Sequence, residues 1–144
     1  MTDRVYLDTS ALAKWYLNEV NSEEFTQFLR SIPSAIISPL TITEMRSLLS
    51  RRRRMFEISE SLEMEIFATF QMDMDKGYLH VVPFETRHFE DATHIIGSLN
   101  NIALRTLDAL HLTIIQYYQI DTLATADQVM ITAAKALNIQ VKAF

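Results

Sequence analysis

Short apolar segments alternate along the chain with longer segments whose apolar residues recur at helical spacing. Val5-Tyr6-Leu7 is the first apolar run, and Leu12, Trp15 and Tyr16 follow it on one face of a helix. Short apolar runs predict five strands, at residues 5–7, 35–38, 79–82, 122–124 and 139–141. Helices are predicted after residue 8, after residue 21, and at about 42–54, 59–75, 86–99, 106–118 and 127–137.

Strands that alternate with helices in this way are typical of a parallel sheet covered by helices on both faces. We therefore expect an α/β, doubly wound fold of about five strands. The chain has no internal repeat, low-complexity segment or long linker, so residues 1–144 are predicted to form a single domain.

The composition limits the cellular environment of the protein but says little about the reaction that it could catalyse. The 144 residues include no cysteine, which excludes disulfides and thiolate metal sites and fits a cytoplasmic protein. The N-terminus lacks the pattern of a signal peptide, and no apolar run approaches the roughly 20 residues of a membrane span. We expect no membrane partner. The net charge of −5 argues only weakly against nucleic acid, because local fields can differ from the total.

Four acidic residues are the main candidates for chemistry: Asp8, Glu44, Asp108 and Asp127. Each lies where a predicted strand gives way to a helix, or in the first turn of a helix. In a parallel sheet these points can meet at one edge, where ligands commonly bind. Carboxylates crowded together repel one another, so this arrangement predicts a bound cation.

For three of these acids, helix capping is the alternative to a role in metal binding. Asp8 stands where an N-cap is expected. Thr41-Ile42-Thr43-Glu44 and Thr125-Ala126-Asp127-Gln128 both match the capping box, with Glu44 in the capping position of the first. Asp108 is harder to explain in this way, because its helix is apolar nearly all round and a buried carboxylate needs a partner.

Four segments carry a resemblance to a known family. They run, in order, from Val5 to Leu12, at Glu44, from Leu104 to Leu112 and from Leu123 to Asp127. Together they resemble the PIN-domain nucleases, most closely the VapC-type toxins of bacterial toxin–antitoxin pairs. The resemblance covers essentially the whole chain, and the segment around Asp108 is its most specific part.

The resemblance implies a three-layer α/β/α fold and Mg²⁺-dependent cleavage of RNA, with Mn²⁺ as a possible substitute. The four acids fall on the family's acidic positions, as catalytic residues and metal ligands. Ser10 matches the family's small hydroxyl residue near the metal, and Thr125 matches the hydroxyl residue often found before the last acid. A cognate antitoxin protein and a homodimer are also implied. The sequence leaves open whether one ion or two would act.

Several basic residues are candidates for RNA binding or catalysis, and each also has an ordinary structural explanation. The run Arg51, Arg52, Arg53 and Arg54, and also Arg105, could contact an RNA backbone. Such a run is also typical of a solvated helix end. His111, one helical turn from Asp108, could assist chemistry or be a hydrogen-bonded core histidine.

Other functions fit less well. Neither glycine lies at a strand-to-helix turn, so the phosphate-binding loops of P-loop and dinucleotide-binding proteins are absent. A phosphotransferase of the haloacid dehalogenase type would need an acid at position 10, which is Ser10. The main alternative is a PIN-like module that binds metal, RNA or protein without cleaving.

Overall fold

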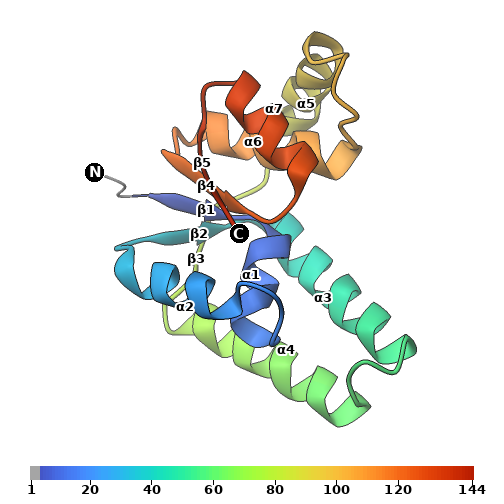
Figure 1. The fold of residues 1–144 in the computed structure, drawn as a ribbon. Coiled ribbons are helices and arrows are strands. Elements are labelled where there is room, and N and C mark those ends of the chain that lie inside the picture. The colour runs from blue at the N-terminus through green and yellow to red at the C-terminus, as the bar shows by residue number, and fades with distance from the viewer. Residues whose placement is uncertain (1–3) are drawn as a thin grey trace.

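The computed structural model describes residues 4–144 as helices and strands that alternate along the chain (Figure 1). The strands are β1 (Val5–Leu7), β2 (Ala35–Ile37), β3 (His80–Val81), β4 (Thr122–Thr125) and β5 (Gln140–Ala143). The helices are α1 (Thr9–Tyr16), α2 (Ser22–Ser31), α3 (Pro39–Arg54), α4 (Glu60–Asp75), α5 (Arg87–Ser98), α6 (Thr106–Tyr117) and α7 (Gln128–Ala136).

The five strands form one sheet in the order β3-β2-β1-β4-β5, and every neighbouring pair is parallel. The first strand is central, with Tyr6 opposite Ile36 on one side and Leu123 on the other. The predicted α/β fold with a parallel five-stranded sheet is therefore confirmed.

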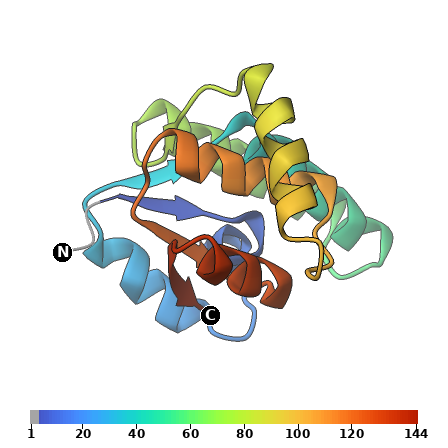
Figure 2. The ribbon, with the colours of Figure 1, turned by 90° about the horizontal axis from the view of Figure 1, so that it is seen from above.

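Helices cover both faces of the sheet, and each face has its own core (Figure 1). Side chains alternate across a strand, so Val5 and Leu7 point to one face and Tyr6 to the other. Val5 and Leu7 join a core with apolar residues of α1 to α4. Tyr6 joins a core with residues of α5, α6 and α7, and Figure 2 shows these helices from above.

Helix α3 begins earlier than predicted. The sequence placed its start near residue 42 and treated Pro39 as the end of a strand, whereas Pro39 is the first residue of the helix and Ser38 is its N-cap. Proline suits this position because the first helical N–H has no helical partner. The predicted capping box ending at Glu44 is therefore wrong, since Glu44 lies beyond the first turn.

The carboxyl ends of β1, β2 and β4 lie at one edge of the sheet, because these strands are parallel neighbours. Each of the three strands leads within two residues into a helix, namely α1, α3 and α7. This edge therefore gathers the starts of three helices. Among residues 4–144, no helix is long and apolar enough to cross a membrane.

Candidate metal centre

The four acidic residues line one cavity at this edge of the sheet. Asp8 reaches it from the end of β1, Glu44 from α3, Asp108 from the first turn of α6, and Asp127 from the start of α7. The cavity has a volume of about 660 Å³, which is within the usual range for ligand sites of roughly 300–1,000 Å³.

Asp8 is the most firmly held of the four acids. Its Oδ1 accepts a hydrogen bond from the Thr9 backbone N–H at 2.8 Å. Its Oδ2 accepts from the hydroxyls of Ser10 at 3.0 Å and Thr125 at 2.8 Å. These donors fix the carboxylate in one orientation. The resemblance gave Ser10 and Thr125 as supporting hydroxyl residues, and in the structure both contact Asp8.

The electrostatic environment of Asp8 disfavours its charge when no cation is present. Burial raises the pKa of Asp8 above its usual value, and Glu44 raises it further. His111 and the two hydroxyl hydrogen bonds lower that pKa, but the net direction is upward. A nearby cation would stabilise the ionised carboxylate that burial penalises.

Glu44 is held by a chain of hydrogen bonds that leads from the cavity into the core. Its Oε1 accepts from the Thr9 hydroxyl at 3.2 Å and is hydrogen-bonded to His111 Nε2. His111 Nδ1 lies 2.6 Å from the Tyr6 hydroxyl, which in turn lies 2.8 Å from the Ser38 hydroxyl. The chain links α6, β1 and the start of α3 to one carboxylate.

His111 holds Glu44 through its Nε2 atom. Burial lowers the pKa of His111, but the hydrogen bond to Glu44 and the charges of Asp8 and Asp108 raise it above its usual value. Both ring nitrogens are occupied, one by Glu44 and one by Tyr6. His111 is therefore a hydrogen-bonded core histidine that supports the site.

Asp108 and Asp127 also stabilise their own helices. Asp108 Oδ2 accepts from the Arg105 backbone N–H at 3.1 Å, and Asp127 Oδ1 accepts from the Val129 N–H at 2.8 Å. Asp127 is itself the N-cap of α7, so the predicted capping box starting at Thr125 is wrong. Thr125 instead accepts from the Asp127 N–H at 3.0 Å.

The donor set fits a hard divalent cation. Asp8, Glu44 and His111 each place a ligand atom within 4.8 Å of the others, and Asp108 and Asp127 line the same cavity outside that group. His111 already uses both nitrogens, so the remaining donors are carboxylate oxygens. Oxygen-only sets of this kind suit Mg²⁺ and Mn²⁺.

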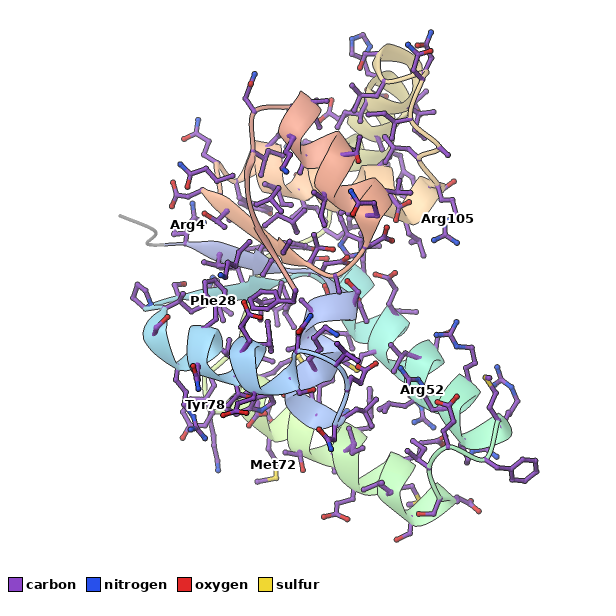
Figure 3. The ribbon with its side chains drawn as sticks, viewed as in Figure 1. Arg4, Phe28, Arg52, Met72, Tyr78 and Arg105 are labelled. Carbon is purple, nitrogen blue, oxygen red and sulfur yellow. The ribbon has the colours of Figure 1, made fainter. Side chains whose placement is uncertain are left out.

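The arginines differ in how they are engaged. Arg52 pairs with Glu19 and Glu57, and Arg53 pairs with Glu63, so these two are bound within the chain. Arg51 and Arg105 line the acidic cavity from α3 and from the start of α6. Figure 3 shows Arg52 and Arg105 on different helical layers of the molecule.

Two supporting residues were not predicted from the sequence. Tyr6 was treated only as part of a strand, and Thr9 only as part of the segment after it. A polar hydroxyl on a central buried strand is a signal for a buried hydrogen-bond network, because such a group needs a partner. The partners themselves come from distant segments, so the sequence pattern alone does not identify them.

A parallel sheet with carboxylates gathered at the carboxyl ends of its strands defines a class of α/β proteins that could bind a metal ion there. Within that class, the model of the PIN domain family matches residues 5–136. The chain belongs to the PIN domain family. No curated protein sequence matches the chain at a significant level.

Solved structures with the same fold include bacterial toxins. VapC20 of Mycobacterium tuberculosis, described as a sarcin-ricin loop cleaving toxin, superposes with a TM-score of 0.73 at 16% identity, covering 90% of this chain and 94% of VapC20. VapBC2 of Rickettsia felis, bound to a DNA fragment from its promoter, gives 0.67 at 12% identity and covers 96% and 97%. FitAcB of Neisseria gonorrhoeae gives 0.62 at 17%, covering 95% of both chains.

Proposed function

We propose that this chain is an Mg²⁺-dependent endoribonuclease and the toxin of a toxin–antitoxin pair. The observation that carries the proposal is the convergence of four carboxylates on one cavity of a PIN domain. The description of VapC20 as a sarcin-ricin loop cleaving toxin supports RNA as the substrate class. Mn²⁺ can replace Mg²⁺ in this proposal, because both prefer oxygen ligands.

The residues divide into ligands and supports. Asp8 and Asp108 are the primary ligands, and Glu44 and Asp127 bind directly or through water. A bound divalent cation supplies activation of a water molecule and offsets charge on the phosphate. Ser10 and Thr125 hold the Asp8 carboxylate in place.

The cavity rim supports binding of a phosphate backbone. Arg51 and Arg105 line the cavity beside the acids. Arg105 is 82% exposed and lies 3.8 Å from Asp108, so its guanidinium can leave that carboxylate at little cost. Of the five arginines considered from the sequence, these two are the best placed to position RNA at the carboxylates.

The partners follow from the same proposal. Solved structures of this fold include a toxin–antitoxin complex from Klebsiella pneumoniae, with a TM-score of 0.61. We propose that a cognate antitoxin protein binds this chain and that the chain forms a homodimer. A module that binds RNA without cleaving it is the second candidate, and the test below separates the two.

The test measures cleavage of a defined RNA with Mg²⁺ or with chelator. Wild-type protein should cleave only with Mg²⁺, and Asp8→Asn should abolish cleavage. Asp75→Asn is the matched control, because Asp75 is an exposed residue at the end of α4. RNA binding without cleavage by the wild type would favour the non-catalytic module, and equal cleavage in chelator would refute the metal role.

A further inference from the structure

Phe56 occupies the turn between α3 and α4 in a conformation that suits glycine. Its φ is 60°, in the left-handed region. The turn closes α3 with two hydrogen bonds, from the Phe56 N–H to the Arg53 carbonyl and from the Glu57 N–H to the Arg52 carbonyl. Helices that end in this way usually carry glycine at the left-handed position, because a side chain is strained there.

Folding buries almost none of the Phe56 side chain, so no burial of apolar surface offsets this strain. The residue is 95% exposed, and its neighbour Met55 is 59% exposed. An aromatic ring normally contributes by burying its large apolar surface. An exposed ring on a strained backbone is therefore a cost to the isolated chain, and such features often mark a binding site.

The turn is connected to the acidic cavity by one face of α3. Glu44, Ser47 and Arg51 line the cavity at successive turns of the helix. Arg54 follows Arg51 by three residues and so lies on the same side of α3. The ten residue steps from Glu44 to Arg54, the last residue of α3, correspond to about 15 Å of helix.

The two arginines on this face are available for a ligand. Both Arg51 and Arg54 are exposed, and neither forms an ion pair within residues 4–144. Arg52 and Arg53, in contrast, are bound to glutamates. The side of α3 that leads from the carboxylates to Phe56 is therefore basic and ends in an exposed aromatic ring.

Phosphate-binding arginines followed by an exposed aromatic ring are typical of single-stranded nucleic-acid sites. A second copy of the chain fits less well, because a two-fold contact centred on this turn would bring the same arginines together. We propose that the α3–α4 turn is a stacking site for single-stranded RNA: Arg51 and Arg54 bind phosphates, and Phe56 stacks on a base several nucleotides from the carboxylates. This inference rests on the proposed ribonuclease function.

Binding in chelator tests the site separately from catalysis. A labelled, unstructured 20-nucleotide RNA is titrated with wild type, Phe56→Gly and Phe56→Trp, and binding is followed by fluorescence anisotropy. Phe56→Gly removes the ring and the backbone strain together, so this variant should fold at least as stably as the wild type. It should bind the RNA at least about fivefold more weakly, while Phe56→Trp retains wild-type affinity.

Phe89→Ala is the matched control, because Phe89 is also an exposed aromatic residue but lies on α5, across the sheet from α3. Phe89→Ala should bind the 20-nucleotide RNA as the wild type does. Equal binding of this RNA by wild type and Phe56→Gly would overturn the proposal. If Phe56→Gly leaves RNA binding unchanged but disrupts self-association in light scattering, the proposal is also overturned, and the turn is instead a dimer contact. If RNA binding depends on Phe56 but the wild type shows no Mg²⁺-dependent cleavage, the stacking site stands and the proposed nuclease activity is refuted.

Discussion

The carboxylate of Asp8 can both cap a helix and bind a cation. An ionised carboxylate has about four lone-pair sites. Three of them accept hydrogen bonds, from Thr9, Ser10 and Thr125. One site on Oδ1 is left for a metal. Capping and metal binding are therefore not alternatives at this residue, although the sequence presents them as such.

Titration of Asp8 should make metal-free stability depend on pH. The pKa of Asp8 is raised in the folded state, so the folded protein binds a proton that the unfolded chain does not. Relative to Asp8→Asn, the wild type should gain stability as pH falls from 8 toward 4, through the raised pKa. Urea unfolding of both proteins across this range measures the effect. A stability difference between wild type and Asp8→Asn that does not change with pH would contradict the assignment.

Tyr6 is the buried centre of the hydrogen-bond chain to Glu44. Tyr6→Phe removes a hydroxyl that contacts His111 and Ser38, and it leaves both of them without that partner. We expect a loss of about 1–3 kcal/mol in the free energy of unfolding.

Tyr118→Phe is the matched control for Tyr6→Phe. The Tyr118 hydroxyl bonds the Pro83 carbonyl at an exposed position, where water can replace it. Its removal should cost less than about 0.5 kcal/mol. Equal losses of unfolding free energy in the two variants, measured by urea unfolding, would show that the buried hydrogen bonds of Tyr6 add no stability beyond that of an exposed one.

At the scale of elements, the sequence predicted the helices and strands well but misplaced the start of α3. The prediction used Thr41 as the cap and ended a strand at Ser38, whereas Ser38 caps the helix and Pro39 is its first residue. The structure uses Ser38, and Glu44 then lies beyond the first turn, where it can reach His111. That contact joins residues 67 positions apart, which no local pattern can predict.

The α3–α4 hairpin is held by a buried glutamate. Glu63 of α4 is only 5% exposed in its side chain and pairs with Arg46 and Arg53 of α3. Glu63→Ala should lower the free energy of unfolding by about 1–3 kcal/mol, because two charge-assisted hydrogen bonds are lost while the half-exposed arginines remain hydrated.

Glu65→Ala provides the matched control on the same helix. Glu65 is exposed, and its loss should change stability by less than about 0.5 kcal/mol. Urea unfolding of the two variants compares them directly. A Glu63→Ala variant as stable as Glu65→Ala would mean that the ion pairs do not hold the hairpin.

At the scale of the whole molecule, the two cores share one sheet, and the acidic cavity lies at its edge. Because β1 contributes to both cores, we propose that residues 1–144 fold as one domain. The sequence predicted that the acids could share an edge, since parallel strands end together. The sequence did not indicate which arginines remain available, because the pairing of Arg52 and Arg53 with glutamates depends on how α3 packs against α4 and the α1–α2 segment.

We propose that the carboxylates of Asp8, Glu44, Asp108 and Asp127 form one divalent-cation site. The most direct test is to measure Mn²⁺ binding by isothermal titration calorimetry without RNA. We expect saturable binding by the wild type. Asp8→Asn and Asp108→Asn should weaken it at least about tenfold, as should His111→Phe through the loss of the partner that orients Glu44. Asp75→Asn should bind as the wild type does. No saturable binding by the wild type, or equal binding by wild type and Asp8→Asn, would contradict the assignment.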